Sequence, residues 1–90
     1  AVDVEFDPGK DAANIAKHGV SLRAGRAVLE NMVGEERDPR PYGGEVRMRA
    51  FGLIQGSLFC CVYTMRGAVR RIISVRVASR REVREWLKDT

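Results

Sequence analysis

The chain has 90 residues with 16 Lys or Arg and 12 Asp or Glu, so its formal net charge is +4. This length suits one small domain, residues 1–90, and the hydrophobic share of 44% is close to that of globular proteins, which argues against two cores and against disorder. No stretch reaches the roughly 20 apolar residues of a membrane-spanning helix, so no membrane association is expected.

The first predicted elements are a strand and a helix. Apolar and acidic residues alternate over residues 2–6, which is the period of a half-buried strand. Asp7 can act as an N-cap, and Pro8 suits the first helical position. We therefore expect a helix from Pro8 to His18, which Gly19 closes in a left-handed conformation. The face expected to be buried consists of Ala12, Ile15 and Ala16.

A second helix and a loop are predicted next. Ser21 can cap a helix that runs to about Asn31. Its expected buried stripe consists of Ala24, Ala27, Val28 and Leu29. Residues 34–44 are rich in Pro, Gly and charged residues, so we expect an exposed loop there.

Three strands are predicted at residues 46–54, 58–65 and 69–77, and the short turns between them favour an antiparallel meander. Apolar residues alternate with arginines along the first of these strands. The second is apolar almost throughout, as a strand covered on both faces would be.

The chain ends in a short predicted helix. Ser79 and Glu82 have the spacing of a capping box, and Trp86 follows on the apolar face, where it is expected to dock the helix. The predicted fold class is α+β: an antiparallel sheet, two N-terminal helices on its apolar face, a short C-terminal helix and a cationic face left partly open.

Charge is distributed unevenly along the chain. Residues 1–45 carry six Lys or Arg and nine Asp or Glu, a balance of −3, whereas residues 46–90 carry ten and three, a balance of +7. Every basic residue between positions 66 and 84 is Arg, whose planar guanidinium matches phosphate. A polyanion is therefore the first partner to consider, and a merely solvated charged face is the alternative.

Cys60 and Cys61 are adjacent, so in a strand their side chains point to opposite faces and are expected to be reduced core thiols. A single His and two adjacent Cys offer no metal-ligand spacing, so no metal and no cofactor are expected. The acidic N-terminal residues differ from the basic and apolar pattern of a secretory signal, so we expect a cytoplasmic location.

Few side chains are candidates for proton transfer. His18 is the only histidine and follows Lys17 at the end of the first predicted helix. Imidazole is the commonest general acid or base, although a histidine at a helix end is more often a partner of the helix dipole. Tyr63 could donate a proton or stack on a base, or it could simply pack its ring.

Candidate phosphate-binding groups are more numerous. Arg80 and Arg81 lie in the first turn of the last predicted helix, where the helix dipole disfavours cations, and this broken rule suggests a phosphate clamp. The other candidates, on strands or at strand ends, are Arg47, Arg49, Arg66, Arg70 and Arg76.

Several short segments follow one another along the chain in an order that is typical of one protein family. They are Phe6-Asp7-Pro8-Gly9-Lys10, Asn14, Lys17-His18-Gly19-Val20-Ser21, Phe51-Gly52, Val62-Tyr63-Thr64, Arg66-Gly67, Arg71-Ile72-Ile73-Ser74, Arg76 and Ala78-Ser79-Arg80-Arg81-Glu82. In this order they resemble the BrnT toxins of bacterial type II toxin-antitoxin systems, over nearly the whole chain. Val75 and Ser79 depart from the pattern, since Ala and Thr are commoner there.

The resemblance implies a RelE-like fold and a metal-independent ribonuclease that inhibits translation. It also implies a cognate ribbon-helix-helix (BrnA-like) antitoxin, with promoter DNA bound only through the toxin-antitoxin complex. On this hypothesis an RNA 2′-hydroxyl attacks the neighbouring phosphorus and leaves a cyclic phosphate. The expected catalytic set is Lys17, His18, Tyr63, Arg76, Arg80 and Arg81, and the expected RNA-binding set is Arg47, Arg49, Arg66 and Arg70.

Two other functions fit parts of the sequence. The first two predicted helices could form a helix-turn-helix that reads DNA with Arg23 and Arg26, but the net negative charge of residues 1–45 opposes this. The basic surface could also belong to a non-catalytic domain that binds an acidic partner. Incubation of the protein with RNA in EDTA distinguishes these functions, because only the ribonuclease would cleave the RNA.

Overall fold

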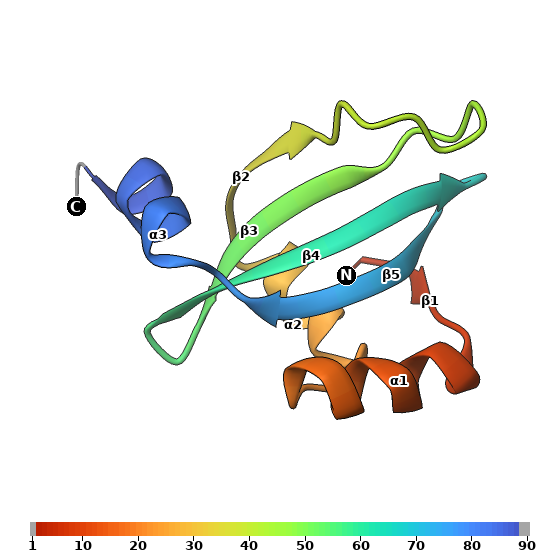
Figure 1. The fold of residues 1–90 in the computed structure, drawn as a ribbon, viewed down its shortest axis with the longest axis horizontal. Helices are drawn as coiled ribbons and strands as arrows, with labels where there is room; N and C mark the ends of the chain where they lie inside the picture. Colours follow the sequence, from red (N-terminus) through yellow and green to blue (C-terminus); the bar gives the residue numbers. More distant parts are fainter. Residues whose placement is uncertain (1, 89–90) are drawn as a thin grey trace.

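The computed structural model describes residues 2–88, which contain five strands and three helices (Figure 1). In chain order they are β1 (Val4–Glu5), α1 (Pro8–His18), α2 (Ala24–Glu30), β2 (Met32–Arg37), β3 (Met48–Ile54), β4 (Ser57–Arg66), β5 (Val69–Val77) and α3 (Arg80–Leu87). The α+β class is as predicted. The predicted bounds of α1, β3, β4 and β5 are correct to within two residues.

The strands form one sheet in the order β1-β5-β4-β3-β2. β3, β4 and β5 make the predicted antiparallel meander, and β2 is antiparallel to β3. β1 instead runs parallel to β5, with Val4 opposite Arg70, so the sheet is mixed and the wholly antiparallel prediction is wrong. β1 and β5 are far apart in the sequence and no hairpin joins them. No tight turn therefore requires the two strands to be antiparallel.

β2 lies partly in the segment that the sequence predicts as a loop. Residues 34–37 pair with β3 as an edge strand, so the loop prediction is wrong for these residues. Gly34, Glu35 and Glu36 have low strand propensity, which hides the strand in the sequence. Charged side chains on an edge strand also oppose further pairing, so this composition suits the position.

β4 is covered on both faces, as its apolar sequence predicts. Cys60 and Cys61 are each 0% exposed and belong to two different apolar clusters, one on each face of the sheet. Burial raises the pKa of Cys60 to about 11 and that of Cys61 to about 12. Both are free thiols, so the prediction of reduced core cysteines is confirmed.

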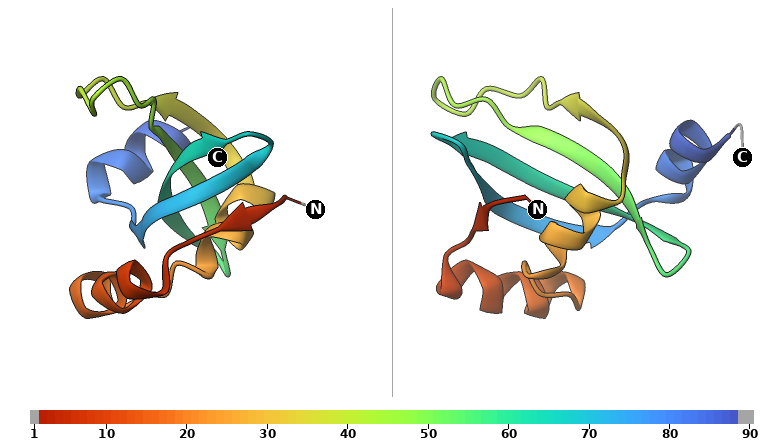
Figure 2. Two further views of the ribbon diagram at one scale, coloured as in Figure 1. Left: turned by 90° about the vertical axis from the view of Figure 1, so that its right-hand side faces the viewer. Right: turned by 180° about the vertical axis from the view of Figure 1, so that it is seen from behind.

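α2 and α3 pack on opposite faces of the sheet (Figure 2). On the α2 side, Leu22, Val28 and Leu29 join the strands in the main core. Gly52 of β3 permits this close approach, because a Cβ there would lie 2.1 Å from the backbone oxygen of Val28. The helix begins at Ala24 with Arg23 as its N-cap, so Ser21 does not cap it as predicted; the Ser21 hydroxyl donates to Asp11 and accepts from the Arg23 N–H.

On the α3 side, the Trp86 ring stacks on Phe51 with the ring centroids 4.8 Å apart. Gly34 of β2 leaves room for the same ring, because a Cβ there would come within 2.3 Å of it. The Ser79 hydroxyl accepts from the Glu82 N–H, and the Glu82 carboxylate accepts from the Ser79 N–H. The predicted capping box and the docking by Trp86 are therefore confirmed.

α1 lies beside β5 (Figures 1 and 2). The polar residues Lys10, Asn14 and Lys17 lie on its side toward β5. The predicted buried face of Ala12, Ile15 and Ala16 is wrong: all three are exposed, and Ile15 is 47% exposed. Asn14 is the one buried residue of this helix. Its side chain bonds the backbone of Val75 in β5, so hydrogen bonds replace the expected apolar contact.

A substitution at Gly52 tests the contact between α2 and β3. We expect Gly52→Ala to lower the free energy of unfolding by about 3 kcal/mol or more, because backbone atoms of α2 occupy the space that a methyl group needs. Gly56→Ala is the control, since its site is open and only its positive φ of 82° is strained, at about 1 kcal/mol. Urea denaturation measures both, and equal losses would contradict the close packing.

Candidate active site

A bulge in β5 sets which side chains face α3. Val62 pairs with Ser74 and Tyr63 pairs with Ile72, so Ile73 has no partner across the ladder. Ile72 and Val75 both belong to the core beneath α2. Ile73 and Ser74 therefore both face the α3 side of the sheet. A bulge typically redirects side chains in this way.

Four arginines lie on this α3 side of the sheet, each paired with a glutamate. We call these four pairs the arginine frame: Arg47 with Glu45 (2.8 Å), Arg49 with Glu36 (2.9 Å), Arg71 with Glu5 (2.7 Å) and Arg76 with Glu82 (2.7 Å). The strand register aligns Arg49, Val62 and Ser74 across β3, β4 and β5. The glutamates come from β1, β2, the loop before β3, and α3, so they lie around the rim of this face.

The Arg76 pair is the most enclosed corner of the arginine frame. Two guanidinium nitrogens of Arg76 donate to the two carboxylate oxygens of Glu82, at 2.7 and 2.9 Å. Arg76 is the largest cause that lowers the pKa of Glu82 to about 2, and the same hydrogen bond raises the pKa of Arg76. α3 thus covers one end of the cationic face that the sequence predicts to be open.

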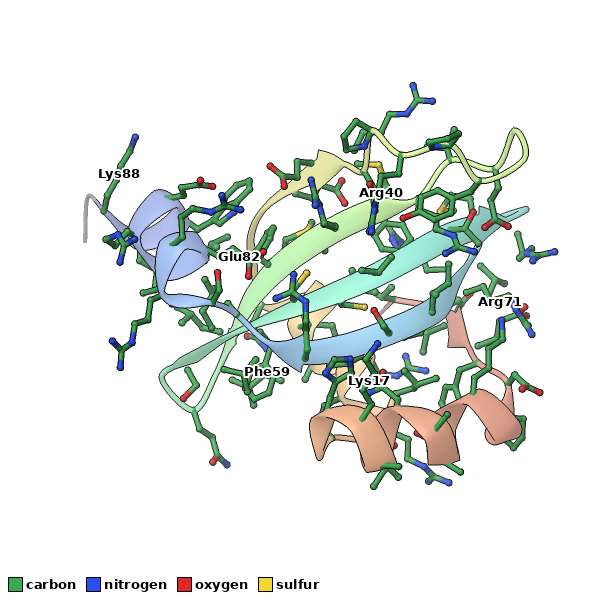
Figure 3. The ribbon with its side chains drawn as sticks, viewed as in Figure 1. Lys17, Arg40, Phe59, Arg71, Glu82 and Lys88 are labelled. Atoms are coloured by element: carbon green, nitrogen blue, oxygen red, sulfur yellow. The ribbon has the colours of Figure 1, made fainter. Side chains whose placement is uncertain are left out.

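A cavity of about 220 Å³ lies where α1 meets β5. Figure 3 shows Lys17 at this junction. Its lining residues are Lys10, Ala13, Asn14, Lys17, His18, Ile73 and Ser74. The basic groups come from α1, the hydroxyl comes from the bulge of β5, and none of these residues is acidic. This arrangement can hold an anion beside a hydroxyl and an imidazole.

The cavity joins residues that the sequence analysis selects to residues that it misses. Lys17 and His18 are both predicted candidates, whereas Lys10 and Ser74 are not. The spacing of Lys10, Asn14 and Lys17 at i, i+4 and i+7 places them on one face of α1, and this signal was available in the sequence. Ser74 had no such signal, because its direction depends on the bulge.

Tyr63 and Arg70 lie on the other face of the sheet. The Tyr63 ring is 4% exposed within the core beneath α2, and its hydroxyl donates to Glu35 at 2.6 Å. Burial and this hydrogen bond raise the pKa of Tyr63. The Arg70 guanidinium lies 5.4 Å from the centre of the same ring. These two predicted site residues therefore do not join the arginine frame.

The remaining predicted arginines lie at the periphery. Arg66 ends β4 and contacts Glu45 at 3.6 Å, and Arg81 contacts Glu85 of its own helix at 3.9 Å. Arg80 is exposed and forms no ion pair within residues 2–88. Of the two arginines in the first turn of α3, it is therefore the one that no carboxylate engages within these residues.

The loop before β3 is ordered by a polar cluster that the sequence analysis misses. Asp38 is 2% exposed and accepts hydrogen bonds from Arg40 and from the Tyr42 hydroxyl. Arg40 holds the pKa of Asp38 well below its usual range. The Arg47 guanidinium lies 4.0 Å from the centre of the Tyr42 ring. This loop therefore orients Arg47 within the arginine frame.

The helix-turn-helix alternative finds little support in this arrangement. α2 has seven residues and lies against the sheet, where Gly25, Val28 and Leu29 are buried. Arg26, proposed above to read DNA, donates instead to the backbone oxygen of Val2. α2 is thus a packing element of the core.

A substitution at Glu82 tests the Arg76 pair. Because the pKa of Glu82 is about 2 in the folded protein and near 4.5 ordinarily, its stabilising effect is complete above pH 4.5 and is lost as the pH falls toward 2. We therefore expect the cost of Glu82→Gln, measured by urea denaturation, to be greater at pH 6 than at pH 2.5 by about 1–3 kcal/mol.

Glu30→Gln is the control for this pH dependence, since Glu30 is exposed and forms no ion pair within residues 2–88. Its cost should be small at both pH values. A cost of Glu82→Gln that does not change with pH would contradict the role given to the pair.

Comparison with known proteins adds a family to this geometry. The family described as "Ribonuclease toxin, BrnT, of type II toxin-antitoxin system" matches residues 6–82, which is most of the chain and includes α1, all of β2 to β5 and the capping box of α3. No curated protein matches the sequence. Within residues 2–88, no helix has the length and apolar character needed to cross a bilayer.

Proposed function

Because the chain belongs to the BrnT family of ribonuclease toxins of type II toxin-antitoxin systems, we propose that it cleaves RNA at the junction of α1 and β5 without a metal ion. Membership of the family implies an RNA target and an antitoxin partner. The observation that carries the proposed site is the cavity that joins Lys17 and His18 of α1 to Ser74 of β5.

The proposed reaction is an internal phosphoryl transfer. The 2′-oxygen of a ribose loses its proton to a base and forms a bond to the adjacent phosphorus. The bond from phosphorus to the 5′-oxygen breaks, and an acid gives that oxygen a proton. The products are a 2′,3′-cyclic phosphate and a free 5′-hydroxyl. Water, oxidants and metals take no part in the balance of this step.

Lys17 and His18 are the proposed proton-transfer groups. They are adjacent at the end of α1 and both line the cavity, so one phosphate can lie within reach of both. His18 is partly exposed, which leaves its ring accessible to substrate and to solvent protons. Tyr63 is not part of this proposal, because its hydroxyl lies on the opposite face and is bonded to Glu35.

The arginines are the proposed phosphate-binding groups. Positive charge near the scissile phosphorus stabilises the additional negative charge of the phosphorane, as the catalytic step requires. Arg49 lies in the same cross-strand row as Ser74, and its Nε is buried without a hydrogen-bond partner within residues 2–88. Arg47, Arg76, Arg80 and Arg81 extend the basic surface along the RNA strand, with Arg66 at its margin. Arg70 lies on the Tyr63 side and is left out.

The proposal also includes a RelE-like fold and a ribbon-helix-helix antitoxin. The mixed sheet with α2 on one face and a basic opposite face supports the first part. An antitoxin that covers the arginine frame would neutralise the toxin, because the same surface would be closed to RNA. Copurification with the product of an adjacent reading frame would test this partner.

Incubation of the purified protein with RNA in EDTA tests the reaction. We expect cleavage with 2′,3′-cyclic phosphate ends, and we expect no cleavage when the ribose 5′ of the scissile bond is replaced by 2′-deoxyribose. Loss of cleavage in EDTA with recovery on adding Mg²⁺ would contradict the metal-independent reaction. Binding to duplex DNA without RNA cleavage would instead support the DNA-binding alternative.

Two substitutions test which face of the sheet carries the reaction. We expect His18→Ala to lower kcat by about 100-fold, since general acid or base catalysis contributes that much. Tyr63→Phe removes only the hydroxyl that bonds Glu35, so kcat should stay within about threefold of the unaltered protein. The reverse order of effects would move the site to the Tyr63 side.

A further inference from the structure

We propose that Asn14 is a positioning residue, which holds Lys17 and His18 at a fixed distance from Ser74. The inference rests on the proposed function, because it concerns the same cavity. It adds a residue to which neither the sequence analysis nor the family description gives a role.

The Asn14 side chain is bonded at both ends of its amide. Its nitrogen donates to the backbone oxygens of Val20 and Val75, each at 2.8 Å, and its oxygen accepts from the Val75 N–H at 3.3 Å. The residue is 6% exposed. Buried amides with all groups paired have one preferred orientation, because any rotation leaves a buried polar group without a partner.

Asn14 and its partner Val75 lie at the two walls of the cavity. Along α1, Lys17 and His18 follow Asn14 by one turn of helix, so their positions depend on where Asn14 is held. Along β5, Val75 directly follows Ser74. One amide thus connects the wall that carries the basic groups to the wall that carries the hydroxyl.

Few side-chain contacts of α1 itself fix this end of the helix to the sheet, and the nearest apolar anchor is Val20, just after the helix, which packs against the main core. The apolar residues Ala12, Ile15 and Ala16 face solvent, so the helix has no apolar seam against β5. The other side-chain anchor is Asp11, whose Oδ1 accepts from the Ser21 hydroxyl and the Leu22 N–H. That anchor ties the helix to the segment that follows it and not to β5.

Asn14 also continues the edge of the sheet. β1 pairs with β5 only at Arg70 and Arg71, so on the side away from β4 no strand lies beside Val75. Asn14 supplies one acceptor and one donor at this point, as a neighbouring strand would. A hydrophobic side chain could fill the same space but would leave the Val75 N–H and C=O without partners.

The test compares two substitutions of Asn14. Asn14→Leu keeps the number and branching of the side-chain heavy atoms and removes all three hydrogen bonds, whereas Asn14→Gln keeps the amide but lengthens its connection to the helix by one methylene. We expect kcat for RNA cleavage to fall at least about tenfold in Asn14→Leu and by a smaller factor in Asn14→Gln, since small displacements of catalytic groups have effects of this size. KM should stay within about threefold, because the arginines still bind the RNA.

His18 provides an independent readout, because it is the only histidine and its ring gives one set of NMR signals. In the unaltered protein we expect nuclear Overhauser contacts between the His18 ring and Ile73, both of which line the cavity. These contacts should weaken, and the ring signals should shift, in both Asn14 variants. Asn31→Leu and Asn31→Gln are matched controls, since the Asn31 amide is exposed and bonds only its own helix.

A folded Asn14→Leu protein with unchanged kcat and unchanged His18 contacts would overturn the proposal. If Asn14→Leu does not fold, Asn14→Gln decides, and unaltered kcat and His18 signals in that variant would have the same force. If the unaltered protein cleaves no RNA, the proposed function fails. The His18 contacts would then still show whether Asn14 holds the end of α1 against β5.

Discussion

The hydrogen bonds between Asn14 and Val75 are the constraint on which the cavity depends. β1 is two residues long and pairs with β5 at only two positions, so β5 continues past it with an uncovered edge. Backbone groups at such an edge need partners if they are buried. The Asn14 amide meets that need, and in doing so it brings the last turn of α1 to the bulge of β5. The cavity lies between these two features.

Much of the fold could be predicted from local pattern, and the failures have physical causes. α1 and α3 begin at caps whose chemistry is visible in the sequence, Asp7 with Pro8 and Ser79 with Glu82, and both bounds are correct. The strand β2 was missed because its pairing with β3 and not its own composition stabilises it. The predicted buried face of α1 was wrong because the prediction assumes that the most apolar face of a helix is the buried one. In this helix the contact with the sheet is made by one amide, and the alanines and Ile15 remain in solvent.

The residues of the candidate site also divide into those that could be predicted from the sequence and those that could not. Lys17, His18, Arg47, Arg49 and Arg76 were selectable by residue type, since few other groups could transfer a proton or bind phosphate. The separation of Arg70 from Arg76 was not predictable, because it depends on the one-residue bulge in β5. The separation of Tyr63 from Arg47 and Arg49 was not predictable either, because it depends on the register of β4 against β3. Ser74 was missed because of the same bulge in β5. Lys10 was missed because its relation to Lys17 becomes informative only once the polar face of α1 is known to meet β5.

The arginine frame also changes what the uneven charge of the chain means. The acidic excess of residues 1–45 and the basic excess of residues 46–90 meet in space, since Glu5, Glu36 and Glu45 pair with arginines of the strands. Paired arginines are already oriented, and the glutamates partly neutralise their charge, so on the proposed function they contribute more to orientation than to affinity. Lys10, Lys17 and Arg80 have no such partner within residues 2–88. Electrostatic attraction of the RNA backbone therefore depends mainly on unpaired groups such as these, two of which line the cavity where the reaction is proposed.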